Sequence, residues 1–228
     1  MKRYEVLLFD VDGTLLDFEL AERQGIEGLL TRFKVPVTEE NRQRYHALNK
    51  RYWQRLEQGE ITREQVLSLR FEEFFGAFGI RVDGMEVDGL YRESLNNSAE
   101  LIRGASALLE ALKPKYELYI VTNGVAATQH KRLRASGLER YFRGIFISEE
   151  AGADKPSKEF FEYVFAGMGR RDTERMLIIG DSLTSDIRGG NNMAVDTLWY
   201  NPHGQENTAG VQVDYEARSL EEVGRLLL

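Results

Sequence analysis

The sequence predicts an α/β fold: a Rossmann-like parallel sheet core into which an all-α helical-bundle cap domain is inserted. Two observations support this prediction. Apolar runs of strand length occur at residues 4–9 and again, in alternation with helical patterns, after residue 100. Such alternation is typical of right-handed βαβ units in a parallel sheet. Residues 17–99, by contrast, show helical periodicity alone, so this segment does not fit into the sheet.

The helical segment begins soon after the first predicted strand. We therefore expect the α/β core to comprise residues 1–16 and 100–228, and residues 17–99 to form a cap over the crevice of the sheet. The loops around residues 17–19 and 96–101 are the expected hinges of this cap.

Apolar stripes predict four helices in the cap. Pro36 ends the first of them, because proline cannot continue a helix. Thr62 and Gln65 have the spacing of a capping box, which predicts the start of the third helix, and Gly79 is expected to end it. The fourth helix is expected over residues 83–95.

Strand and helix patterns alternate along the core. The helices are expected at residues 105–112, 126–135, 158–166 and 183–192, and the later strands at residues 116–121, 144–147, 176–179 and 195–199. Ligands bind at the carboxyl ends of the strands in an open parallel sheet. The residues that follow these strands are therefore the candidates for a functional site.

Polar or charged residues follow four of the predicted strands. They are Asp10 and Asp12 after the first strand, Thr122 and Asn123 after the second, Lys155 after the third, and Asp181 and Asp186 after the fourth. Each group has an ordinary structural explanation: Asp-Gly turns are common, Thr-Asn-Gly can cap a helix, most lysines are solvated, and acids favour helix N-termini. Their joint occurrence at four strand ends exceeds these explanations and indicates one composite site.

The composition excludes several classes of function. The 228 residues include no cysteine, which excludes disulfides, thiolate catalysis and cysteine-ligated zinc. The net charge of −7 argues against a nucleic-acid-binding surface, and no apolar run approaches the roughly 20 residues of a membrane helix. No signal-peptide layout precedes the first strand, and the absence of cysteine fits a cytoplasmic location, which is therefore expected. An acidic chain that handles a phosphate needs local cations, which favours a divalent metal.

These motifs, in this order, resemble those of the haloacid dehalogenase-like (HAD) hydrolase superfamily. Asp10-Val11-Asp12-Gly13-Thr14 is similar to its first motif, and Thr122, Lys155 and Gly180-Asp181…Asp186 are similar to the second, third and fourth. A helical cap between the first and second motifs is typical of the subgroup with small helical caps. Residues 49–53, 59–62 and 70–72 of the cap, and residues 147–152 and 201–203 of the core, further resemble YjjG-type pyrimidine 5′-nucleotidases.

The resemblance implies a role for each acidic residue of the motifs. Asp10 would be the nucleophile that attacks phosphorus and forms an aspartyl-phosphate. Asp12 would be the general acid for the leaving alkoxide and later the base for the attacking water. Asp10, Asp181 and the backbone carbonyl of Asp12 would bind Mg²⁺. Asp186 would either ligate the metal directly or hold the motif lysine or a metal-bound water.

Substrate binding is expected to involve both the core and the cap. By resemblance, Lys155 and Thr122 would contact the transferred phosphoryl group, together with the backbone amides around Asn123. In the cap, Trp53 and Phe18 could stack on a nucleobase. Aromatic residues at helical spacing equally well belong to the core of the cap, so both interpretations stay open for these two residues.

The resemblance therefore implies a Mg²⁺-dependent phosphomonoester hydrolase whose partner is a small phosphorylated metabolite, with pyrimidine nucleoside 5′-monophosphates favoured and no nucleic acid or membrane partner. The alternatives are a phosphoglycolate or sugar-phosphate phosphatase, a phosphomutase, a 2-haloacid dehalogenase and a non-catalytic module on the same fold. Dehalogenation needs neither a metal nor a leaving-group acid, so Asp12 and Asp181 argue against it. A non-catalytic module is expected to lack Asp10 or Asp12, and both are present.

Overall fold

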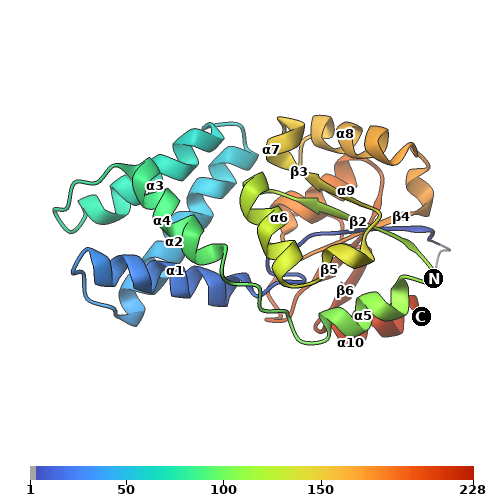
Figure 1. The fold of residues 1–228 in the computed structure, drawn as a ribbon. Helices are drawn as coiled ribbons and strands as arrows, with labels where there is room; N and C mark the ends of the chain where they lie inside the picture. Colours follow the sequence, from blue (N-terminus) through green and yellow to red (C-terminus); the bar gives the residue numbers. More distant parts are fainter. Residues whose placement is uncertain (1–3) are drawn as a thin grey trace. The chain divides into compact units, whose positions relative to one another are not determined.

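The computed structural model describes residues 4–228, which form two compact units. Unit 1 comprises the residues up to Asp17 together with Glu100–Leu228, and unit 2 comprises Phe18–Ala99. Figure 1 shows the helices and strands of both units. Among residues 4–228, none of the helices combines the length and the apolar character that a membrane-spanning segment needs.

Unit 1 is built around a six-stranded parallel sheet, which confirms the predicted fold class. In sheet order the strands are β3 (Gly144–Ile147), β2 (Glu117–Thr122), β1 (Val6–Phe9), β4 (Met176–Gly180), β5 (Asp196–Tyr200) and β6 (Tyr215–Ala217). β1 pairs in parallel with β2 and with β4, so that Phe9 lies opposite Ile120 and Ile179. The carboxyl ends of these three strands are therefore neighbours at one end of the sheet.

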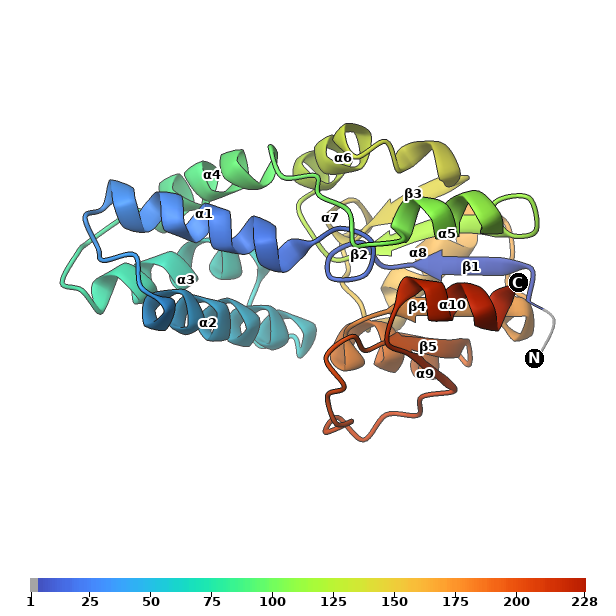
Figure 2. The ribbon, with the colours of Figure 1, turned by 90° about the horizontal axis from the view of Figure 1, so that it is seen from below.

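Helices cover both faces of the sheet, because its central strands are apolar on both sides. One hydrophobic core contains side chains of α5 (Ala105–Leu112) and α10 (Leu220–Leu227), which lie side by side (Figure 2). The other contains side chains of α8 (Lys158–Met168). The remaining helices are short connections between strands: α6 (Ala126–Ala135), α7 (Ser148–Ala151) and α9 (Arg188–Asn192).

Unit 2 consists of the helices α1 (Phe18–Arg32), α2 (Glu39–Glu57), α3 (Arg63–Gly76) and α4 (Gly84–Leu95). Their apolar stripes meet in one core with an aromatic centre, where Tyr45 packs against Phe71 and Tyr91. The predicted capping box is confirmed: the Thr62 hydroxyl accepts a hydrogen bond from the backbone N–H of Gln65, and the Gln65 side chain accepts one from the backbone N–H of Thr62.

Several details differ from the sequence prediction. α3 ends at Gly76 rather than at Gly79, because the chain tightens into i→i+3 hydrogen bonds before Gly79 adopts a φ of 72°. The helix predicted over residues 183–192 is a π-helical turn, Leu183–Ile187, followed by α9. Sequence reasoning also missed α7, β6 and α10. α7 and β6 are too short to show a periodicity. For α10 a signal was present in the sequence but was not used: Ser219 is a good N-cap residue, and an apolar stripe follows it.

Candidate active site

The candidate site lies where β1, β2 and β4 end. Asp10 follows β1, Thr122 ends β2 and Asp181 follows β4. The backbone N–H of Asp10 continues the ladder by donating to the Ile179 carbonyl at 2.9 Å. Because the three strands are parallel neighbours, their carboxyl ends bring these polar residues together.

A buried ammonium group joins the nucleophile candidate to a second carboxylate. Lys155 Nζ donates to Asp10 Oδ1 at 2.8 Å, to Asp186 Oδ1 at 2.6 Å and to the Val121 carbonyl at 2.8 Å. Lys155 and Asp186 are each only 1% exposed, and Asp10 is 7% exposed. The three acceptors match the three donors of an ammonium group, so the buried positive charge is fully paired.

The carboxyl groups of the site destabilise one another's charged forms. Burial raises the pKa of Asp10 to about 7, although the neighbouring Lys155 opposes this shift. Desolvation, together with the charges of Asp10 and Asp186, raises the pKa of Asp181 well above its usual range. The Asp181 side chain is exposed, so the charges of Asp10 and Asp186 are the main cause of this shift. One ammonium group does not balance three carboxylates, which favours an additional cation here.

The lysine itself is held firmly in its charged form. Burial lowers the pKa of the Lys155 ammonium, but the negative charges of Asp10 and Asp186 outweigh that effect, so the pKa lies above its ordinary value. Asn123 fixes the loop that carries the lysine: its side chain donates to the Lys155 carbonyl at 2.9 Å and accepts from the Lys155 N–H at 2.8 Å. Asn123, a predicted substrate-binding residue, thus uses both polar atoms of its side chain on the Lys155 backbone.

Two glycines permit the close approach of the acidic side chains. Gly13 has a φ of 83°, and a Cβ at this position would lie 2.6 Å from Asp181 Oδ2. A Cβ on Gly180 would overlap the carboxylate of Asp186. Larger residues at either position would therefore displace an acid of the site.

The Asp12 side chain is held by α6, which the sequence analysis did not anticipate. Gln129 Nε2 donates to Asp12 Oδ2 at 2.7 Å, and Arg132 Nη1 forms an ion pair with Asp12 Oδ1. The same Gln129 amide group donates to Thr122 Oγ1 at 2.9 Å. The available signal was a glutamine and an arginine three residues apart, hence on one face, in the helix directly after the Thr122 strand.

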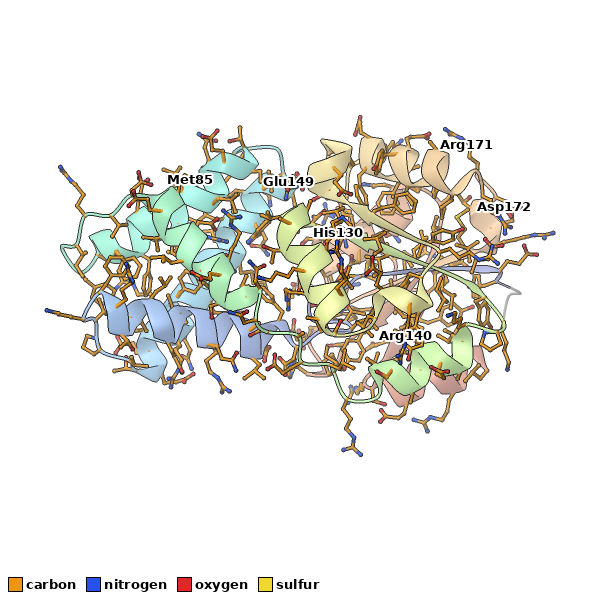
Figure 3. All side chains as sticks on the ribbon, viewed as in Figure 1. Met85, His130, Arg140, Glu149, Arg171 and Asp172 are labelled. Carbon is orange, nitrogen blue, oxygen red and sulfur yellow. The ribbon has the colours of Figure 1, made fainter. Side chains whose placement is uncertain are left out.

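α7 braces the start of α6. The Glu149 carboxylate accepts a hydrogen bond from the backbone N–H of Ala126 at 2.8 Å, where it also interacts favourably with the helix dipole. Glu150 contacts His130 Nε2 at 2.9 Å, and Figure 3 labels Glu149 and His130 on their two helices. α7 therefore contacts and supports the helix whose side chains reach Asp12.

Three carboxylates of the site form a group that can hold a metal ion. Asp10, Asp181 and Asp186 each offer an oxygen, and these atoms lie within 4.8 Å of one another. Hard oxygen donors with an excess of negative charge suit Mg²⁺. Asp186 thus belongs to this group and also contacts Lys155. Asp12 is predicted to bind the metal through its backbone carbonyl, and the contacts of its side chain with α6 are compatible with that role.

Trp53 and Phe18, the predicted nucleobase contacts, lie in unit 2. Both side chains are half-buried and pack against the hydrophobic core of that unit. This packing accounts for their aromatic character without a ligand, and their contact with substrate stays a prediction.

Comparisons with known proteins agree with the geometry of the site. The profile of the haloacid dehalogenase-like hydrolases matches residues 4–193. YfnB of Bacillus subtilis (strain 168), named as a HAD-hydrolase, is 43% identical over 227 residues, which cover 100% of this chain and 97% of YfnB. A crystal structure of YfnB bound to magnesium matches with a TM-score of 0.93 and covers 99% of both chains.

Two further relatives are named for an activity. Pyrimidine 5′-nucleotidase PynA of Streptococcus pneumoniae (strain ATCC BAA-255 / R6) is 39% identical, over 96% of this chain and 93% of PynA. Pyrimidine 5′-nucleotidase YjjG of Escherichia coli (strain K12) is 33% identical, over 99% of this chain and 98% of YjjG. The resemblance inferred from the motifs is thereby confirmed, and the chain belongs to the haloacid dehalogenase-like hydrolase family.

Proposed function

We propose that this hydrolase is a Mg²⁺-dependent phosphatase that cleaves phosphomonoesters through an aspartyl-phosphate on Asp10. The observation that carries the proposal is the buried contact of Lys155 with Asp10 and Asp186, next to Asp181 at the ends of parallel strands. This arrangement presents a carboxylate oxygen, a fixed positive charge and a set of metal-binding oxygens in one place. In-line attack on a phosphomonoester needs all three.

The reaction would proceed in two displacements. In the first, an oxygen of Asp10 forms a bond to phosphorus, the bond from phosphorus to the leaving oxygen breaks, and Asp12 transfers its proton to that oxygen. In the second, Asp12 accepts a proton from water, the water oxygen attacks phosphorus, and the bond to Asp10 breaks. Inorganic phosphate leaves, and both aspartates return to their starting states.

The other residues of the site would stabilise the phosphoryl group while it is transferred. Lys155 holds the Asp10 carboxylate in place and supplies positive charge beside it. Thr122 offers a hydroxyl at the end of β2. Mg²⁺, held by Asp10, Asp181, Asp186 and the backbone carbonyl of Asp12, would supply the charge that an acidic site needs to accept a phosphate dianion.

The names of two relatives support pyrimidine nucleoside 5′-monophosphates as the favoured substrates, since PynA and YjjG are both called pyrimidine 5′-nucleotidases. Unit 2 would then act as the cap that selects the substrate, with Trp53 and Phe18 as candidates for stacking on the base. A small phosphorylated metabolite as the partner and a cytoplasmic location both fit this proposal.

A substrate panel tests the proposal. We expect the protein to release inorganic phosphate from p-nitrophenyl phosphate and, faster, from UMP, dUMP and dTMP than from phosphoglycolate or sugar phosphates, and to lose this activity in EDTA. Asp10→Asn should abolish turnover while its circular dichroism spectrum stays that of the wild type. Wild-type turnover by this variant would refute the nucleophile assignment. Activity that survives EDTA would refute the metal, and equal rates on all substrates would refute the nucleotide preference alone.

A further inference from the structure

The side chain of Asp12, which the proposed mechanism needs for proton transfer, is held by other side chains of the core unit. Asp12 is 23% exposed, and both of its carboxylate oxygens are engaged by α6, one by Gln129 and the other by Arg132. Gln129 and Arg132 are themselves 2% and 1% exposed. Buried donors of this kind are costly to leave without partners, so the contact constrains the carboxylate as much as it constrains α6.

Gln129 links two parts of the site that follow different strands. Its amide nitrogen uses both hydrogens, one on Asp12 after β1 and one on Thr122 at the end of β2. Gly124 makes room for it, since a Cβ there would lie 3.0 Å from the Gln129 side chain. The glutamine therefore couples the direction of the Asp12 carboxylate to that of the Thr122 hydroxyl.

Resting on the proposed function, we infer that Gln129 and Arg132 are positioning residues, which hold the Asp12 carboxylate where it can exchange protons with the leaving oxygen and with water. The loop after β1 leaves the Asp12 side chain two freely rotating bonds. Two contacts from one helix restrict that freedom. Neither residue needs to touch the substrate for this effect.

The leaving group decides whether one or both displacements of the mechanism require Asp12. A nucleoside alkoxide needs a proton in order to leave, so both steps require a correctly placed Asp12. p-Nitrophenolate leaves without a proton, so only the second step, the attack of water on the aspartyl-phosphate, requires Asp12. A displaced Asp12 should therefore let the enzyme release one equivalent of p-nitrophenolate quickly and then stall.

The test compares Gln129→Met and Arg132→Met with Arg134→Met, which makes the same change at a 70% exposed arginine on α6. Stopped-flow absorbance with p-nitrophenyl phosphate and steady-state phosphate release from UMP are measured for each, in the presence of Mg²⁺. We expect both buried-site variants to show a burst of about one p-nitrophenolate per active site, and a kcat for UMP reduced about 10²-fold with little change in KM. Arg134→Met should behave as the wild type.

Asp12→Asn, measured in the same way, distinguishes a failure of the positioning role from a failure of the proposed function. If Asp12→Asn gives the burst and Gln129→Met does not, or if Gln129→Met slows both substrates equally without a burst, the positioning role is refuted while the proposed function stands. If Asp12→Asn turns over like the wild type, the role of Asp12 in the proposed function fails, and the positioning role fails with it. Should Arg132→Met not fold by circular dichroism, Gln129→Met decides the question, because methionine keeps the length of the glutamine side chain.

Discussion

Replacing Lys155 with methionine measures how strongly one buried ammonium group holds the site together. Lys155 Nζ lies 2.8 Å from Asp10 Oδ1 and 2.6 Å from Asp186 Oδ1. Methionine fills similar space without a charge, so two buried carboxylates lose their shared partner. Removing one partner of a buried ion pair costs about 3–5 kcal/mol, and we expect the free energy of unfolding to fall by this amount at pH 9.

The loss of stability should become smaller as the pH falls. In the wild type the folded-state pKa of Asp10 is about 7, raised from an ordinary 3.8 even though Lys155 lowers it. Without the ammonium group this pKa rises further, so the folded variant binds a proton at pH values at which wild-type Asp10 is still ionised. The pKa of Lys155 is itself raised, so its contribution to wild-type stability is present throughout pH 6–9. The difference between the two proteins is therefore largest at pH 9 and smaller at pH 6.

Urea unfolding followed by circular dichroism, in EDTA at pH 9 and pH 6, provides the measurement. Lys158→Met is the matched control, because Lys158 is an exposed lysine only three residues away, at the start of α8. This control should change the free energy of unfolding by no more than about 0.5 kcal/mol. The reasoning is refuted if Lys155→Met falls within the same margin at pH 9, or if its loss of stability grows toward pH 6.

Two further predictions concern the metal and the glycine behind Asp186. Mg²⁺ at about 100 times its Kd should raise the free energy of unfolding by about 2.7 kcal/mol. Asp181→Asn should reduce this gain, because it removes one of the carboxylates that can hold the ion. A thermal melt that Mg²⁺ leaves unchanged would contradict the metal assignment. Gly180→Ala places a Cβ in the space of the Asp186 carboxylate and should lower kcat about 10²-fold. Gly89→Ala is the control and should leave kcat unchanged, because a Cβ there meets nothing within 4 Å. Equal kcat values for the two variants would contradict the steric explanation.

Much of the candidate site could be predicted from the sequence because each of its residues follows a pattern that is visible in a short stretch of chain. An apolar run that stops at Asp10, or at Gly180 before Asp181, is visible within ten residues of chain. The rule that ligands bind at the carboxyl ends of parallel strands then places these residues together without knowledge of any single contact. Helix caps are equally local, which is why the capping box of Thr62 and Gln65 could be identified.

The partners of the predicted residues could not be derived in this way. Gln129 and Asp12 are separated by 117 positions, and Asn123 and Lys155 by 32. Nothing in the periodicity of the Gln129 helix indicates which turn faces the loop after β1. A hydrogen bond also needs a direction as well as proximity, and local patterns carry no information about direction.

The sequence alone determined the α/β class, the inserted helical segment and the acidic and basic residues that gather at the strand ends, because apolar periodicity and strand-end chemistry are properties of short stretches. Only the tertiary structure decided that Lys155 contacts Asp10 and Asp186 together, that Asn123 holds the Lys155 backbone, and that α6 engages both oxygens of Asp12. These contacts join residues far apart in the chain, and their geometry depends on how neighbouring strands and helices pack.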